Sequence, residues 1–275
     1  MAITNFITSV WSETLLNSLE KEYVAVRNCN REFEGEIKAK GDSVKVCAVN
    51  SVSVFPYSKN SVLSEPQTLD DKAVRISADV ARAFNFQIDD IDKAQAAPGI
   101  MKSAMRQAAS ALANEADKYV YGLHNHENVT QVEFSENVSA DNILDTIISL
   151  RQTMLMNNVN SNTETVLEVS PVVASIILKA QIAKLGNNSE AMYNGYIGSC
   201  IGFDIYVSNN IRFVDNAFKC FARTKRAIAF VEKINSIVAY RPDNRFADAI
   251  KGLYLFGAKI IYPEELIIAS IKPGI

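Results

Sequence analysis

The sequence has no excess of positive charge and no run of charges of one sign. Its 275 residues include 28 Lys and Arg against 31 Asp and Glu, which gives a formal net charge of −3. A dedicated nucleic-acid-binding protein usually carries a strong basic excess. Contact of this chain with DNA or RNA is therefore expected to be weak, local or indirect.

Long apolar runs and paired cysteines are also absent. No run approaches the roughly 20 apolar residues of a membrane-spanning helix, and the N-terminus lacks the basic and apolar parts of a signal peptide. These absences favour a cytoplasmic protein without membrane contact. The cysteines form no CxxC pair and are predicted to be free, mostly buried thiols; they are Cys29, Cys47, Cys200 and Cys220.

Residue types that carry catalysis are scarce. The two histidines are His124 and His126, and the nearest carboxylates, Glu127 and Glu133, complete no tetrahedral metal set. A solvated helix C-terminus, where imidazole is mildly favoured, is the simpler interpretation of the pair. The sequence contains no Gly-x-Ser-x-Gly turn, and no cysteine has a histidine near it in sequence.

An acidic cluster and a set of spaced glycines each admit a structural interpretation. Carboxylates at Asp89, Asp90 and Asp92 could bind Mg²⁺ or Ca²⁺, but aspartates before a helix more often cap its N-terminus. The glycines do not lead from a strand into a helix, so they predict neither a dinucleotide site nor a phosphate loop; they are Gly195, Gly198 and Gly202.

One basic cluster consists of Arg223, Lys225 and Arg226. Arginine and lysine side chains there could contact phosphate. The cluster lies between two predicted strands, however, and a turn is the favoured interpretation.

The periodicity of the apolar residues changes along the chain. An amphipathic helix is predicted over 9–24, followed by alternating segments up to about residue 88 with a polar loop at 58–72. These alternating segments have too few large apolar residues to form their own core, so we expect a two-sided β-arm that neighbouring copies cover.

The strongest predicted helix covers about residues 98–123, which at 1.5 Å per residue would be roughly 39 Å long. A second helix follows Asp141, and helices, strands and a polar loop at 186–200 then succeed one another. The C-terminal part returns to strands. Because strands and helices do not alternate regularly, the predicted fold class is α+β and not a doubly wound sheet.

Several segments in order resemble the major capsid proteins of tailed bacteriophages, which have the Hong Kong 97-type fold. The opening from Thr4 to Glu20 resembles their N-terminal arm. Four further segments resemble parts of the same family. Residues 31–46 resemble the entry into its extended loop, and residues 86–95 resemble the segment before its long helix. Residues 198–209 resemble a recurrent segment of its axial domain, and residues 246–259 resemble the returning strand of its peripheral domain.

The resemblance implies a division of the chain into four parts. Residues 1–34 would form an N-terminal arm and residues 35–80 an extended β-loop. Residues 81–137 and 241–275 would form a peripheral domain with the long spine helix, and residues 138–240 an axial domain. The polar loop at 186–200 would be either an axial contact at the centre of a capsomer or an ordinary surface loop.

The resemblance also implies a function. Many copies, as pentamers and hexamers, would assemble in the host bacterial cytoplasm into an icosahedral shell, the virion capsid, around double-stranded DNA. A portal and a separate scaffolding protein would take part, since the capsid-like opening begins at Thr4. No enzyme activity, catalytic residue, cofactor or metal is expected.

Three alternatives remain open at this point. An encapsulin-type compartment would share the fold but enclose a protein cargo, and a soluble enzyme with an unrecognised site would form small particles. Lys59 and Asn60, near the expected tip of the loop, could form the isopeptide crosslink found in some relatives. A solvated charge is the simpler interpretation of that lysine.

Overall fold

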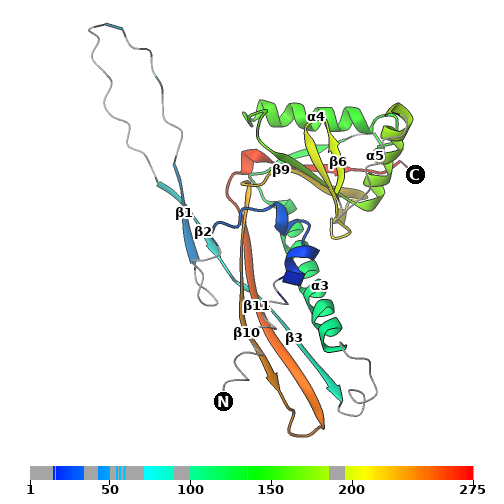
Figure 1. Cartoon of the computed structure of the whole chain (residues 1–275). Helices are drawn as coiled ribbons and strands as arrows, with labels where there is room; N and C mark the ends of the chain where they lie inside the picture. Colours follow the sequence, from blue (N-terminus) through cyan, green and yellow to red (C-terminus); the bar gives the residue numbers. More distant parts are fainter. Residues whose placement is uncertain are drawn as a thin grey trace.

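The computed structural model describes residues 15, 17–33, 43–49, 54, 56, 58–59, 71–89, 100–134, 136–185 and 196–274. In this part of the chain the strands form sheets of two, three and seven strands. The long helices lie against the larger sheets (Figure 1). Strands and α-helices alternate only between residues 80 and 200, and the described strands before and after this part follow one another without an α-helix. The predicted α+β class is therefore confirmed. None of the described helices is long and apolar enough to cross a membrane.

The three-stranded sheet is antiparallel and has the order β10–β11–β3. Its strands are Ile228–Tyr240, Ala247–Ile260 and Val80–Asp89, respectively. Helix α3, Ile100–Tyr121, runs along this sheet (Figure 1). It buries residues at helical spacing against the sheet, because an apolar stripe must find an apolar partner; they are Met105, Ala109, Leu112, Ala116 and Val120.

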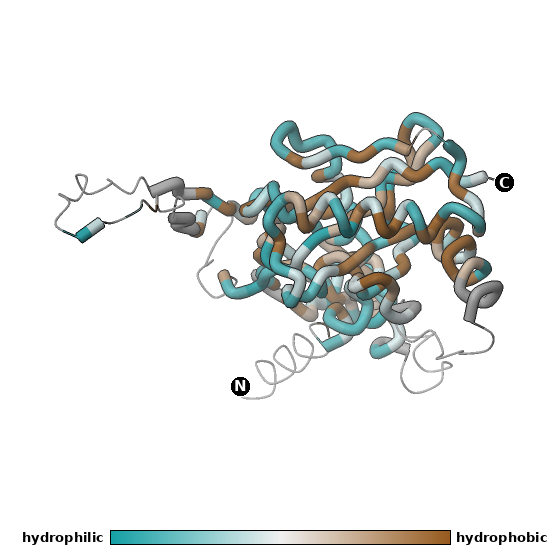
Figure 2. Tube along the Cα trace, turned by 90° about the horizontal axis from the view of Figure 1, so that it is seen from above, coloured by the Kyte–Doolittle hydropathy of each residue, from teal (hydrophilic) through white to brown (hydrophobic). Residues whose placement is uncertain are grey.

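The seven-stranded sheet has the order β4–β12–β9–β5–β7–β6, and β8 pairs with β9. In chain order the strands are Thr130–Glu133 (β4), Thr165–Val169 (β5), Tyr196–Cys200 (β6), Phe203–Val207 (β7), Phe213–Val214 (β8), Ala217–Thr224 (β9) and Leu266–Ile271 (β12). Helices α4, Ile143–Met156, and α5, Pro171–Leu185, pack on it. Figure 2 shows hydrophobic and hydrophilic residues alternating along the elements of this body.

Short 3-10 helices connect these elements. They are η1 at Val26–Asn28, η3 at Gly122–Asn125 and η4 at Pro263–Glu265. Before η1, residues 17–22 form the described part of the predicted N-terminal helix. Leu15 and Leu19 are fully buried there, since they belong to the same core as α3.

The strand pairing differs from the predicted domain boundaries at three strands. Residues 228–240 were expected in the axial domain, yet β10 pairs with β11 of the three-stranded sheet. Residues 130–133 and 266–271 were expected in the peripheral domain, yet β4 and β12 belong to the seven-stranded sheet. The physical reason is that alternation predicts a strand but not its partner, which is chosen by packing across long sequence distances.

The predicted loop at 186–200 is wrong for its last five residues. Residues 196–200 form strand β6, which pairs antiparallel with β7. Residues 186–195, including Gly195, lie outside the described part. Gly198 and Gly202 have positive φ values of 121° and 80°, which glycine adopts without the steric cost of a Cβ atom.

The expected β-arm is present only in part, as an antiparallel hairpin of two strands; residues 80–89, which were also expected in it, form β3 and pair with β11. Strands β1, Ser43–Val49, and β2, Asp71–Ser77, pair along their whole length and project from the body (Figure 1). At the base, Val44 and Ile76 are buried against residues of β10 and β11. Further along the arm, Val54 is 94% exposed. The arm is thus anchored only at one end within the described residues.

A close backbone contact holds the base of the arm on β11. An ideal Cβ atom on Gly257 would lie 1.9 Å from the backbone oxygen of Ser77. No heavy atom tolerates that distance, and a backbone oxygen cannot rotate away as a side chain can. Glycine at this position therefore allows the end of β2 to lie directly on the sheet.

We predict that Gly257→Ala lowers the free energy of unfolding by about 1–3 kcal/mol, which is the usual cost of overpacking. Gly122→Ala is the matched control, because its added methyl group would meet no heavy atom within 4 Å. It should change stability by less than about 0.5 kcal/mol. Chemical denaturation of the two variants measures both effects, and equal stability would show that β2 does not rest on Gly257.

Candidate functional site: a buried clasp between two sheets

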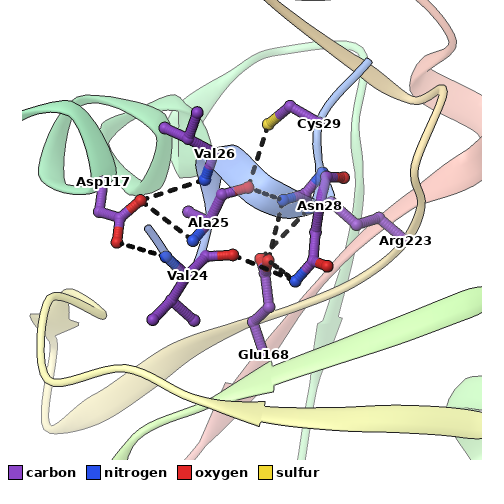
Figure 3. Close-up of polar contacts among 8 residues, drawn as sticks. All are labelled: Val24, Ala25, Val26, Asn28, Cys29, Asp117, Glu168 and Arg223. Carbon is purple, nitrogen blue, oxygen red and sulfur yellow. Dashed lines mark hydrogen bonds and ion pairs between the residues drawn. The ribbon is translucent and has the colours of Figure 1, made fainter. Parts of the chain in front are cut away.

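A short N-terminal segment runs between helix α3 and the seven-stranded sheet. We call residues 24–29, together with Asp117, Glu168 and Arg223, the clasp (Figure 3). The three charged side chains come from α3, β5 and β9, and each is at most 1% exposed. Burying charge is costly unless each group finds partners, so the contacts of these groups decide what the clasp does.

Asp117 binds the amide groups of the segment. One carboxylate oxygen accepts the N–H of Val24 at 3.0 Å, and the other accepts those of Ala25 and Val26 at 3.0 and 3.1 Å. The first amides of a helix have no partner inside it, and here a side chain from α3 supplies one for η1. Burial raises the pKa of Asp117 to about 7, although the three amide donors lower it.

Arg223 binds the carbonyl groups of the same segment. Its guanidinium donates to the backbone oxygens of Ala25 and Asn28 at 2.8 and 2.5 Å. It also forms a fork on Glu168, with N···O distances of 2.8 and 3.2 Å. A planar guanidinium suits this bidentate geometry, which lysine could not reproduce.

Asn28 and Cys29 complete the polar contacts of the clasp. The Asn28 amide donates to a carboxylate oxygen of Glu168 at 3.0 Å and to the backbone oxygen of Val24 at 3.2 Å. The Cys29 thiol lies 3.2 Å from the Ala25 oxygen. Burial raises the pKa of this thiol to about 11, so it stays protonated and unreactive. Cys29 and Cys220 are free and buried, as predicted, and Cys200 is free and half-buried.

A second buried carboxylate holds the two ends of the segment. Glu232 of β10 accepts hydrogen bonds from the hydroxyls of Tyr23, at 2.5 Å, and Tyr254. Its other oxygen accepts from Arg31 at 2.6 Å. Burial and the charge of Glu232 raise the pKa of both hydroxyls well above their usual range, so they remain donors at physiological pH.

The clasp therefore cross-links two sheets through one piece of backbone. The amides of the segment face α3, which packs on the three-stranded sheet, and its carbonyls face Arg223 of the seven-stranded sheet. Asn30 extends the link, since its backbone pairs with Ile228 and Phe230 at 2.8 and 2.9 Å. Without this segment, Asp117 would lose its three amide donors and Arg223 would lose two of its four hydrogen bonds.

The structure places the two histidines away from any metal set. His124 is buried, not solvated as predicted, and its Nδ1 lies 3.0 Å from the Tyr121 oxygen. The described residues contain no group of three or more side chains that could hold a metal ion. Asp89 is the last residue of β3 and pairs across from Ala247. Asp90 and Asp92 lie outside the described residues.

The phosphate hypothesis for the basic cluster is wrong for Arg223. Arg223 is fully buried in the clasp. Lys225 and Arg226 form the predicted turn and are engaged by carboxylates, with Lys225 2.7 Å from Glu164 and Arg226 paired with Glu265. Sequence patterns alone did not single out Asp117 and Glu168, although both interrupt otherwise apolar patterns. Asp117 lies next to the buried stripe of α3, and Glu168 lies in a wholly buried strand.

No family model matches the chain, and no curated protein matches its sequence. Solved structures do match. A chain of Mycobacterium phage Che8 is 24% identical, with a TM-score of 0.69 over 92% of both chains. The capsid structure of Cyanophage P-SCSP1u is 14% identical, with a TM-score of 0.68 over 86% of this chain and 85% of that chain.

An encapsulin complex from Synechococcus elongatus PCC 7942 has a similar backbone. It is 8% identical, with a TM-score of 0.58 over 86% of this chain and 84% of that chain. At such identities the likeness concerns the fold. The expected Hong Kong 97-type fold is thereby confirmed over nearly the whole chain.

We predict that Arg223→Met destabilises the isolated chain by about 3–5 kcal/mol, because it leaves the Glu168 carboxylate buried and unpaired. Lys225→Met, two residues away, removes the same charge from an exposed pair and should change stability little. Adding Glu168→Leu to Arg223→Met should restore part of the lost stability, because it removes the unpaired carboxylate. The recovery should be incomplete, because the backbone oxygens of Ala25 and Asn28 still lack the donors that Arg223 supplied. Denaturant unfolding of the three variants measures this, and equal losses in both single variants would contradict it.

We predict that Asp117 makes the fold less stable as the pH rises from about 4 to 7. Its pKa is about 7 in the folded chain and about 3.9 in an unfolded chain, so unfolding in this range releases a proton. The stability that protonated Asp117 contributes is complete below pH 4 and is lost as the pH rises through 7.

Asp117→Asn, which does not titrate, is the reference for that prediction. The difference in unfolding free energy between the native chain and this variant should fall by about 1.4 kcal/mol per pH unit between pH 4 and 7, then level off. Urea unfolding at several pH values measures it. A constant difference across this range would show that Asp117 keeps its ordinary pKa.

Proposed function

We propose that this chain is a major capsid subunit of a tailed bacteriophage. Many copies would assemble, as pentamers and hexamers, into an icosahedral shell that encloses double-stranded DNA. The observation that supports this proposal most strongly is the fold itself, which the chain shares with solved phage capsids along nearly its whole length. Such a subunit belongs to the virion capsid and needs no catalytic site or cofactor.

Exposed apolar side chains on separate parts of the molecule support this proposal. Val54 lies on the arm, Phe246 lies at the turn between β10 and β11, and Met156 ends helix α4; they are 94%, 82% and 74% exposed. Contiguous exposed apolar side chains are typical of surfaces that bind other proteins, whereas single ones are common on any protein. Met156 lies in such a group, because it lines one hollow together with Ile148, Leu155 and Ile201.

The clasp gives the proposal a mechanical basis. Assembly from many copies requires that each copy present its contact surfaces at fixed relative positions, because docking of rigid bodies loses little conformational entropy. The clasp joins the two sheets through buried, hydrogen-bonded charges. The arm, in contrast, is anchored at its base and extends from the body (Figure 1). We infer that the body positions the subunit and the arm reaches a neighbour.

An encapsulin-type compartment is the second candidate, and the likeness to the Synechococcus encapsulin complex favours keeping it. The two functions share a shell and differ in its contents. Nucleic acid inside the particle supports a capsid, whereas one co-purifying protein supports an encapsulin. A soluble enzyme would form neither kind of shell.

We predict that the purified, concentrated chain forms closed shells or regular tubes under negative-stain electron microscopy. The test includes co-expression with any scaffolding protein encoded next to it. Nuclease digestion and mass spectrometry of the particles then identify their contents. Small discrete particles under every condition would contradict the proposed function.

We predict that Phe246→Asp abolishes shell formation without lowering the stability of the isolated chain. The ring is almost fully exposed in the single subunit, so its replacement costs no core packing, but a charge would oppose burial against a neighbour. Phe246→Tyr keeps the aromatic ring and should still form shells. Shells from the aspartate variant would show that this turn lies outside the contacts.

A further inference from the structure

A polar pocket of about 370 Å³ lies between the N-terminal helix and the first turns of α3. Its volume falls within the range of small ligand sites, roughly 300–1,000 Å³. Polar or charged residues form its lining; they are Asn17, Ser18, Lys21, Glu22, Lys102 and Arg106. We call this the basic pocket.

The cations of the basic pocket have no carboxylate partner in the described part of the chain. Other exposed cations of α3 and its surroundings are paired: Lys118 and Arg82 bind Glu115 at 3.1 and 3.3 Å. No such ion pair forms at Lys21, Lys102 or Arg106 among the described residues. The pocket thus holds three cationic groups whose charge is not compensated by an ion pair.

The single carboxylate of the pocket does not change this balance. Glu22 accepts a hydrogen bond from the Ser110 hydroxyl at 3.5 Å. It forms no ion pair with a lining cation among the described residues. Among the described lining residues the three cations outnumber this one carboxylate, so this lining is positive although the whole chain has a net charge of −3.

The packing of the two helices creates this arrangement. Leu15 and Leu19 lie in the same core as Met105 and Ala109, so the polar edges of both helices meet beside the apolar contact. Residues four apart lie on the same side of a helix. Lys102 and Arg106 are therefore neighbours along α3, about 6 Å apart in rise, and Lys21 faces them from the other helix across the pocket.

We propose that Lys21, Lys102 and Arg106 bind the phosphodiester backbone of double-stranded DNA. This inference rests on the proposed function, which supplies the DNA. All three side chains are hydrogen-bond donors that carry positive charge, and a guanidinium matches two phosphate oxygens at once. The described lining residues include no aromatic ring on which a base could stack, so the site would recognise the backbone and not the sequence.

An acidic segment of a protein is a different partner that the pocket fits less well. The centre of a protein–protein contact is depleted of charge and enriched in apolar and aromatic groups. The described lining of the basic pocket, in contrast, consists of polar and charged residues. Phosphate contacts from a few cations give weak binding that falls steeply with salt. That behaviour suits a shell that must enclose DNA without holding it fast.

The test measures binding of the isolated full-length chain to a fluorescent DNA duplex by anisotropy at several salt concentrations. The slope of log Kobs against log salt should be about −0.9 for each neutralised phosphate. Replacing Lys21, Lys102 and Arg106 by glutamine should reduce the magnitude of this slope by roughly 2–3. The control removes three exposed lysines elsewhere, so that net charge changes equally: Lys118→Gln, Lys225→Gln and Lys259→Gln.

The control variant should keep the slope of the native chain. Equal slopes for the pocket and control variants would overturn the proposal, as would a native chain that binds no DNA at low salt. Polyglutamate of matched charge is the competitor, and displacement of DNA at equal concentration would assign the pocket to acidic protein segments instead. Shell formation is scored separately, so DNA binding and the proposed capsid function can fail independently.

Discussion

The fully buried ion pair of Arg223 and Glu168 is the interaction on which the rest of the structure depends. Neither side chain has any exposed surface, so each charge is tolerable only while its partners stay in place. The guanidinium has partners on β5 and on the N-terminal segment. The position of that segment is therefore coupled to the seven-stranded sheet by the cost of leaving buried guanidinium N–H groups without acceptors.

Asp117 mirrors this arrangement from the opposite side. In the peptide between Ala25 and Val26, Asp117 accepts from the N–H and Arg223 donates to the C=O, so the two side chains hold opposite ends of this peptide group. Such an arrangement fits the direction of the backbone dipoles. The core around α3 already includes Phe221, Leu266 and Ile268 of the seven-stranded sheet, so the clasp adds polar contacts to an apolar contact between the two sheets.

Much of the fold was predictable from local patterns. The helix over about 98–123 is observed at Ile100–Tyr121, and the arm strands alternate as expected. The partners of β10 and β12 were not predictable, because a strand pattern is the same whichever sheet it joins. The clasp could be predicted only in part. Glu168 stands out in an apolar strand, but nothing in the sequence indicates that Arg223, 55 residues away, is its partner.

The sequence by itself determined the α+β class, the long helix, the arm and the absence of strong overall charge, because these follow from periodicity and composition. The tertiary structure alone decided which charges are used and which are free. It buried Arg223, which the sequence offered as a phosphate ligand, and it brought Lys21 beside Lys102 and Arg106. The physical reason is that partners far apart in the chain meet only when apolar faces pack, and their packing decides which polar groups remain in water.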